Sequence, residues 1–258
     1  MMIWVGLSTS TTVFANDAEL AQKLANPVAD IISLPFQLNY DQNIGADENI
    51  DRYQLNIQPV IPFTISENWN VISRTVLPVI YQEYHHLAVF DDWGTGDLTQ
   101  SFFFTPHPKL TKGLIVGFGP ALLLPTASEK RLGADQYGLG PTVVIAKQAK
   151  GWTYGALANH IWAVEKERAA TGINNTFLQP FINYTTPNSV TWSFNTESNY
   201  DWNSNDYSIP INLSFSKLMV IEKQPLSMGA GLRYWIHDHE NSAKDLGVRL
   251  TASFIFPK

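Results

Sequence analysis

The last residues of the chain alternate between apolar and polar side chains. Within residues 247–258, the apolar members of this pattern are Val248, Leu250, Ala252, Phe254 and Phe256. Successive side chains of a β-strand point to opposite faces, so a period of two predicts a strand with one apolar face. Several earlier segments repeat the pattern at strand length. The chain is therefore expected to be dominated by β-strands.

Length and composition exclude several classes of protein. The 258 residues suit one barrel domain or about two average soluble domains. With 17 basic and 23 acidic residues the net charge is −6, which argues against nucleic acid as a partner. The absence of cysteine excludes disulfides and thiolate metal sites. No apolar run reaches the roughly 18 residues that a membrane helix needs.

Twelve segments have the length and period of strands. They are residues 34–41, 53–65, 71–84, 96–105, 113–126, 138–148, 152–164, 176–185, 190–200, 207–217, 226–237 and 247–256. Their connections alternate between short turns and longer polar loops, the asymmetry of a bacterial outer-membrane barrel with an even number of strands. The sequence therefore predicts an all-β fold: a transmembrane, antiparallel, up-and-down β-barrel of about 12 strands over residues 34–258, with a short N-terminal helix.

The two faces of the predicted strands differ in polarity. In residues 207–217, for example, Leu213 belongs to the apolar face and Ser214 to the polar face. A soluble sandwich buries the apolar face, whereas a membrane barrel turns it to lipid and keeps the polar face in its lumen. Aromatic residues gather near both ends of the predicted strands. Two such belts are expected at the two interfaces of a bilayer and favour the barrel.

Seven charged or polar residues are predicted to face the lumen. They are Arg74, Asp97, Gln179, Asn183, Glu197, Arg233 and Arg249. One interpretation is an ion-pair network that satisfies buried charges. The other is a lining that filters solutes. Both interpretations stay open, because the two roles are compatible in a barrel of this size.

The N-terminal part of the chain does not follow the strand pattern. Residues 1–15 resemble the back half of a secretory signal peptide, with Val13 and Ala15 placed before a cleavage site. Residues 16–33 are predicted to form an amphipathic helix. Its apolar stripe is Leu20, Leu24, Val28 and Ile31. The helix is expected either to enter the lumen as a plug or to pack on the periplasmic rim.

Proline is frequent inside the predicted strands. The seven cases are Pro59, Pro62, Pro78, Pro120, Pro141, Pro180 and Pro210. Each removes one hydrogen bond from the ladder, and an unsatisfied backbone group costs roughly several kcal/mol in hydrocarbon. These prolines are therefore expected to lie at bulges or to be covered by groups of the lumen.

Signals for catalysis or metal binding are weak. His85, His86 and the segment 237–240 contain competent metal ligands, but they lie in or beside the predicted outer loops, which favours ordinary solvated residues over a metal site. Asn159 and His160 resemble a pair in an outer-membrane phospholipase, yet the serine required two residues later is absent. No enzymatic activity, metal or cofactor is expected.

Several longer stretches are similar, in order along the chain, to one family. They are LANPVADIISLPFQLNYDQN, NIQPVIPFTISENWNVISRTVLPVIYQ, GDLTQSFFFTP, GFGPALLLPTA, LQPFINY, ESNYDW, IPINLSFSKL and the ending GLRYW with GVRLTASFIFP. These stretches, from about Leu24 to Phe256, resemble the MetA-pathway of phenol degradation family, a group of predicted outer-membrane transporters. The resemblance implies a barrel transporter linked to aromatic compounds by genomic context, and it brings no catalytic residues.

The expected function is a porin-like channel for passive uptake or efflux of small, aromatic or hydrophobic solutes across the outer membrane of a Gram-negative bacterium. Expected partners are outer-membrane lipids, small-molecule solutes and the barrel assembly machinery, which would engage the C-terminal strand. The alternatives are a structural or adhesive barrel, an outer-membrane lipid-modifying enzyme and a soluble ligand-binding sandwich. A nucleophile beside His160 would favour the enzyme, and partitioning into the soluble fraction would favour the sandwich.

Overall fold

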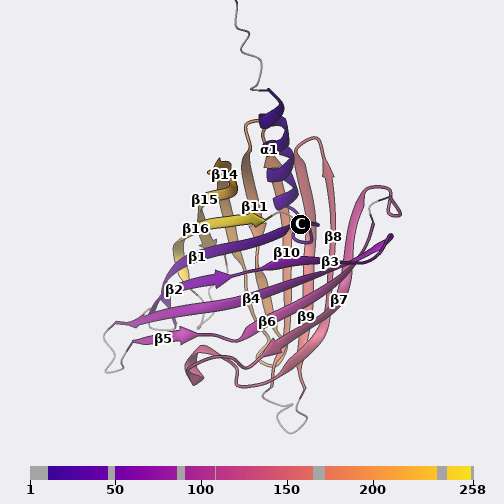
Figure 1. Ribbon diagram of the computed structural model, residues 1–258. Helices are drawn as coiled ribbons and strands as arrows, with labels where there is room; N and C mark the ends of the chain where they lie inside the picture. The colour runs from indigo at the N-terminus through magenta and orange to yellow at the C-terminus, as the bar shows by residue number, and fades with distance from the viewer. Residues whose placement is uncertain are drawn as a thin grey trace, which may run out of the picture.

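The computed structural model describes residues 11–45, 50–85, 91–107, 109–164, 172–236 and 243–256. This part of the chain forms a helix, α1 (Thr11–Leu24), and a short 3-10 helix, η1 (Lys130–Leu132). The remaining elements form one antiparallel sheet that closes into a barrel (Figure 1). Its segments are β1 (Ile32–Ile44), β2 (Ile50–Ile57), β3 (Val60–Ser66), β4 (Trp69–Tyr84), β5 (Asp92–Thr95), β6 (Leu98–Pro106), β7 (Leu114–Leu124), β8 (Gly138–Ala149), β9 (Trp152–Ala163), β10 (Asn174–Thr185), β11 (Val190–Thr196), β12 (Ser198–Asp201), β13 (Asp206–Ser208), β14 (Pro210–Ile221), β15 (Gln224–Trp235) and β16 (Lys244–Phe256).

The sixteen segments make twelve spanning strands, because four spanning strands are each interrupted once. The interrupted strands are β2 with β3, β5 with β6, β11 with β12, and β13 with β14. Neighbouring strands pair in antiparallel fashion, and the pairings of β10 with β11 and of β1 with β16 complete the ring. The prediction of an all-β, 12-stranded antiparallel barrel with a short N-terminal helix is confirmed.

The outer wall of the barrel is apolar and its inner wall is polar. Leu213, Leu232 and Leu250 on the outer wall are 53%, 50% and 50% exposed, respectively. Asn212 and Arg249, at alternating positions on β14 and β16, are 1% and 4% exposed. Arginine inside and leucine outside is the polarity of a membrane barrel, because a water-soluble protein has the reverse arrangement. The strands therefore place their two faces as their sequence indicates.

Aromatic side chains cluster at both ends of the outer wall. At the end with the longer connections, the ring centroid of Tyr53 lies 4.8 Å from that of Tyr40 and 6.0 Å from that of Tyr81. At the end with the short turns, the rings of Trp152 and Tyr184 are 4.8 Å apart. Amphipathic rings at these two levels suit the two interfaces of a lipid bilayer.

Several prolines coincide with irregularities in the strands. Pro59 lies in the break between β2 and β3. Pro120 of β7 pairs in register with Pro141 of β8, and the β6–β7 and β8–β9 ladders are interrupted beside this pair. Proline has no N–H to donate to a ladder, so these interruptions are expected. Gly140 permits a close approach there, because an added Cβ would lie 1.6 Å from the carbonyl oxygen of His160.

The N-terminal helix differs from the predicted helix over residues 16–33. It ends at Leu24, residues 25–31 form turns and β1 begins at Ile32. Pro27 accounts for part of this difference, since proline disfavours helical geometry at the residue before it and supplies no N–H donor. No helix in the described ranges has the length and apolar character needed to cross a membrane.

Candidate functional site

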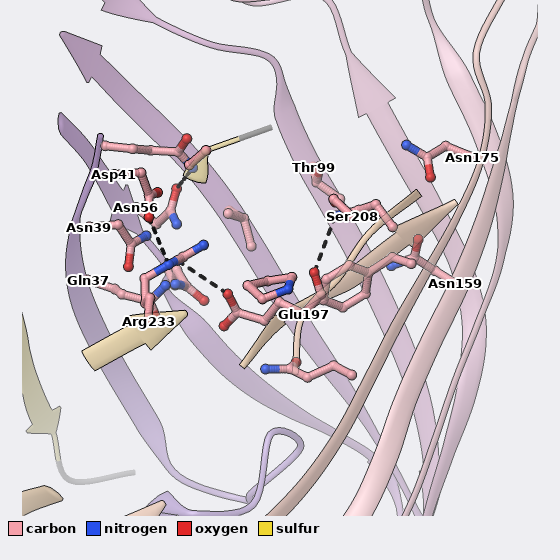
Figure 2. Close-up of a pocket in the computed structure, with 18 of the residues that line it drawn as sticks. Gln37, Asn39, Asp41, Asn56, Thr99, Asn159, Asn175, Glu197, Ser208 and Arg233 are labelled. Carbon is pink, nitrogen blue, oxygen red and sulfur yellow. Dashed lines mark hydrogen bonds and ion pairs between the residues drawn. The ribbon is translucent and has the colours of Figure 1, made fainter. Parts of the chain in front are cut away.

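The interior of the barrel holds two cavities of about 550 Å³ and 280 Å³. The larger one lies toward the longer connections and is named the loop-side cavity (Figure 2). The smaller one lies toward the short turns and is named the turn-side cavity. Gln37, Gln58, Arg74 and Gln179 line both of them. The two cavities therefore meet at these four side chains, named the junction.

Charge is confined to one arc of the lumen. The charged side chains that line the cavities are Asp41, Arg52, Arg74, Glu197, Arg233 and Arg249. They belong to one continuous arc of the ring, which is named the charged wall. This arc begins at β11 and β12, continues through β15, β16, β1 and β2, and ends at β4. Among the described residues, the arc from β6 to β10 contributes only uncharged lining residues, and it is named the uncharged wall. In Figure 2, Asp41 and Arg233 lie across the cavity from Asn159 and Asn175.

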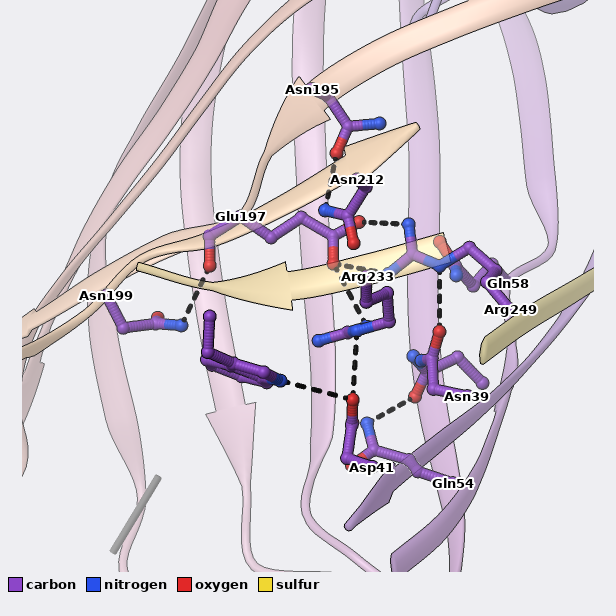
Figure 3. Close-up of polar contacts among 12 residues, drawn as sticks. Asn39, Asp41, Gln54, Gln58, Asn195, Glu197, Asn199, Asn212, Arg233 and Arg249 are labelled. Atoms are coloured by element: carbon purple, nitrogen blue, oxygen red, sulfur yellow. Dashed lines mark hydrogen bonds and ion pairs between the residues drawn. The ribbon is translucent and has the colours of Figure 1, made fainter. Parts of the chain in front are cut away.

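Glu197 is the centre of an ion-pair network on the charged wall (Figure 3). It lies in the break between β11 and β12. Arg249 Nη1 and Nη2 donate to its two carboxylate oxygens at 2.9 and 2.7 Å, and Arg233 Nη1 lies 3.6 Å from Oε2. A bidentate contact of this kind is strong and fixes the relative orientation of both groups. Because β14 and β15 separate β11 from β16 in the sheet, the network connects strands of the charged wall that do not pair with each other.

The two arginines of this network have further partners. Arg249 Nε donates to Asn39 Oδ1 at 2.8 Å. Arg233 Nε lies 3.1 Å from Asp41 Oδ1 as an ion pair, although its N–H finds no hydrogen-bond acceptor in the described part of the chain. Trp235 Nε1 donates to the same Asp41 oxygen at 3.4 Å, and the guanidinium carbon of Arg233 lies 5.2 Å from the Trp235 ring centroid. These contacts hold both guanidinium groups against the wall.

The other two lumen arginines have neutral partners. Arg74 Nη2 donates to Gln58 Oε1 at 3.0 Å, and Arg52 Nε donates to Gln82 Oε1 at 2.7 Å. Within the ranges that the structure describes, neither guanidinium forms an ion pair with a carboxylate. The described residues that line the cavities thus include four arginines and two carboxylates, a net charge of +2. The sign is opposite to that of the whole chain, whose net charge is −6.

The turns that follow α1 occupy part of the lumen at the turn end. Val28 is buried there, in a turn, whereas the sequence predicts a helix at this position. Its cluster consists of the lumen-facing side chains Val60, Ile72, Phe103, Val144 and Leu157. Hydrogen bonds from Gln148 to the Gln22 carbonyl (2.5 Å) and from Asn183 to the Ala25 carbonyl (3.4 Å) tie the segment to β8 and β10. Residues 25–31 therefore close part of the barrel next to β3, β4 and the adjoining strands β6, β8 and β9 of the uncharged wall.

The remaining members of the predicted apolar stripe pack elsewhere. Leu20, Leu24 and Ile31 surround a buried cluster that contains Leu218 of β14 and Ile255 of β16. Both of these partners lie at the turn end of the charged wall. The helix α1 thus stands at the rim of the barrel (Figure 1), and the turns after it enter the lumen.

Hydroxyl side chains of the charged wall surround the turn-side cavity. They are Ser33, Thr191, Ser193, Ser214, Ser216, Ser227, Thr251 and Ser253. Among the described residues of β6, β7, β8 and β9, none lines this cavity. Val28 packs against that part of the wall, so the open space at the turn end follows the charged wall.

The structure distributes the predicted lumen residues over two levels. Those lining the loop-side cavity are Arg74, Gln179, Glu197 and Arg233, and those lining the turn-side cavity include Asn183 and Arg249. Asp97 lines neither cavity, because it lies in the break between β5 and β6. Its carboxylate accepts hydrogen bonds from the backbone N–H groups of Ala127 (3.2 Å) and Ala134 (2.6 Å), so it anchors the connection between β7 and β8.

Asp41 and Arg52 are lumen residues that the sequence prediction missed. The predicted strands end at Asp41 and resume at Tyr53, whereas β1 and β2 extend farther, to Ile44 and back to Ile50. The signal that identifies Arg52 is the alternation of polar and apolar residues over Ile50–Ile57. The same alternation places Asp41 on the inner face together with Gln37 and Asn39, but no sequence signal shows that Asp41 pairs with Arg233.

The candidates for catalysis and metal binding do not assemble into a site in the described ranges. No group of three His, Asp or Glu side chains suited to a metal comes together there. His86 and residues 237–240 lie outside the described residues. His160 belongs to an aromatic cluster, with its ring 4.1 Å from that of Trp162 and its Nδ1 2.7 Å from Thr176 Oγ1.

A channel of known structure has a similar architecture. The COG4313 outer membrane channel from Pseudomonas putida F1 is 14% identical to this chain, with 90% of this chain and 97% of that chain covered and a TM-score of 0.68. The chain has the fold of an outer-membrane β-barrel. The calcium-bound outer membrane phospholipase dimer from Salmonella typhi is 11% identical, with 93% and 96% covered, but its TM-score of 0.48 carries no argument about this barrel. No protein-family model and no curated protein sequence matches the chain.

Proposed function

We propose that the protein is a channel in the outer membrane of a Gram-negative bacterium and that small solutes diffuse through it. The observation that carries this proposal is the hollow, polar lumen inside an apolar outer wall. Two cavities meet at the junction around Arg74 and together extend toward both ends of the barrel. A structural or adhesive barrel requires no such space. The shared fold with the Pseudomonas putida channel supports the same function.

The proposed route for a solute follows the charged wall. It begins in the loop-side cavity, crosses the junction and leaves through the turn-side cavity along the hydroxyl side chains. Val28 and its apolar partners exclude a solute from the part of the turn end that faces β6, β8 and β9. The segment 25–31 therefore acts as a partial plug that narrows the channel and leaves one side open.

Small solutes with an apolar part suit the loop-side cavity best. Its volume of about 550 Å³ falls in the range of roughly 300–1,000 Å³ that is typical of small-molecule sites. Leu123, Ile161 and Phe177 contribute apolar surface to its lining. An aromatic or hydrophobic solute is therefore a fitting cargo. Membership of the MetA-pathway of phenol degradation family, which we propose from the sequence resemblance, agrees with this choice.

The route of the protein to its membrane is also part of the proposal. Residues 1–15 act as a signal peptide, although residues 1–10 lie outside the described residues. The strand β16 ends at Phe256, whose side chain is 40% exposed on the outer wall. The barrel assembly machinery engages this strand, and the apolar outer wall then contacts outer-membrane lipids.

Liposome swelling with purified, refolded protein tests the proposed function. Liposomes that contain the barrel should swell in iso-osmotic solutions of small solutes, whereas protein-free liposomes should not. Folding is verified independently by heat-modifiable migration on a gel. A correctly folded barrel that admits none of the solutes would contradict the channel and would favour the structural or adhesive alternative.

A further inference from the structure

Only some of the arginines in the lumen are neutralised by a carboxylate partner. Of the two lumen carboxylates, Asp41 pairs with Arg233, and Glu197 pairs with both Arg233 and Arg249. Arg52 and Arg74 have only the amide oxygens of glutamine side chains as hydrogen-bond partners among the described residues. The excess charge of the cavities therefore resides on Arg52 and Arg74. A cavity with low-dielectric walls and charge of one sign concentrates solutes of the opposite sign.

These two arginines stand at successive points of the proposed route. Arg52 lines the loop-side cavity alone, whereas Arg74 lines both cavities. Gln179 of β10 also lines both cavities and lies on the other side of the ring from β4. A solute that moves from one cavity to the other therefore passes between Arg74 and Gln179.

Arg74 has free capacity to bind an anionic group at this point. Its guanidinium presents several N–H donors in a planar fork, and the bond to Gln58 uses one of them at Nη2. The remaining donors allow a two-point contact with a carboxylate, which is the geometry that a guanidinium recognises best. A lysine at this place would supply the charge without the fork.

We infer that the channel selects small organic carboxylates and that Arg74 binds the carboxylate group as it crosses the junction. This inference rests on the proposed channel function and adds the charge of the solute to it. Phe177, which lines the loop-side cavity from β10, lies across the ring from β2 and Arg52. The arginines thus face the charged end of the solute, and the uncharged wall faces its apolar body.

The reversal potential in planar bilayers under a potassium chloride gradient measures this selectivity. Wild-type protein should prefer chloride over potassium by about sevenfold, because one unit charge about 7 Å from a permeating ion in a water-like dielectric attracts the anion and repels the cation by a factor of about 2.7 each. Arg74→Gln should lower this preference by a similar factor, and Arg74→Lys should largely restore it. The matched control is Arg131→Gln, since Arg131 is exposed and pairs with Asp92 outside the cavities; it should leave the reversal potential unchanged.

The outcomes separate this inference from the channel function itself. A folded wild-type barrel that conducts but does not prefer chloride overturns the inference and leaves the channel standing. A folded barrel that never conducts overturns both. If Arg74→Gln conducts with the wild-type reversal potential, Arg74 is not the selecting residue.

A second measurement needs no variant. Benzoate and benzylammonium share an aromatic body and differ in the sign of their charge. Added at millimolar concentration to wild-type channels in potassium chloride, benzoate should reduce the single-channel current and benzylammonium should not. Equal effects of the two compounds would overturn the selection of carboxylates.

Discussion

Different interactions stabilise the side chains of the two lumen walls. On the charged wall, Glu197 and its arginines connect strands that do not pair in the sheet. On the uncharged wall, contacts are apolar: Phe103 and Leu157 are almost completely buried in the cluster around Val28. Charged groups in a protein interior keep hydrogen-bond partners or water, whereas apolar groups are stabilised by excluding water.

This difference explains where the open space lies. Apolar side chains pack to high density, so the cluster around Val28 leaves no room for a solute next to the uncharged wall. The small hydroxyl residues of the charged wall cannot fill the space in front of them, and the turn-side cavity lies there. A single barrel can thus combine a close-packed apolar cluster that excludes solutes with an open polar passage, provided that its two walls differ in composition.

The largest expected effect concerns the charged wall. Glu197→Gln removes the negative charge that Arg249 and Arg233 share; Arg249 then has no carboxylate partner among the described residues, and Arg233 keeps only Asp41. Removing one partner of a buried ion pair is costly, so the free energy of unfolding should fall by about 3 kcal/mol. Urea titration of the barrel in lipid vesicles measures this quantity.

The matched control for that substitution is Glu129→Gln, which changes an exposed carboxylate in the same way. Its effect should stay within about 0.5 kcal/mol. Equal and small effects of both substitutions would show that the network does not stabilise the charged wall.

A smaller effect is expected for the apolar seal. Val28→Ala removes two carbon atoms from the buried cluster at the uncharged wall, and the free energy of unfolding should fall by about 1–2 kcal/mol. The same titration measures it, with Val164→Ala as the control because Val164 is 57% exposed. If both valines prove equally dispensable, the segment 25–31 does not seal the lumen.

Much of this architecture follows from the sequence. The period of two locates all twelve spanning strands, and it places Leu213 outside and Arg249 inside, because a closed barrel has only two faces for its side chains. These features depend on residues that are close in the chain.

The remaining features depend on residues that are distant in the chain. The contact of Glu197 with Arg249 requires the ring to close in one register, and no local pattern encodes that register. The helix ends early because Val28 packs into the barrel instead of extending the apolar stripe. Asp97 follows the inward parity of its strand, but a break redirects it to the connection between β7 and β8. Sequence patterns therefore predict faces, whereas partners are set by the closed structure.

The position of the open space along the charged wall can be measured directly, because the chain contains no cysteine. Single cysteines are introduced at Ser216, which lines the turn-side cavity, and at Thr153 of β9, which is 0% exposed. Both replace a hydroxyl residue near the turn end, one on each wall. Each variant is exposed to the anionic reagent 2-sulfonatoethyl methanethiosulfonate during single-channel recording. The current through the Ser216→Cys channel should fall as the reagent reacts, and the current through the Thr153→Cys channel should not change. Block at Thr153→Cys with no effect at Ser216→Cys would place the passage along the uncharged wall and contradict this account.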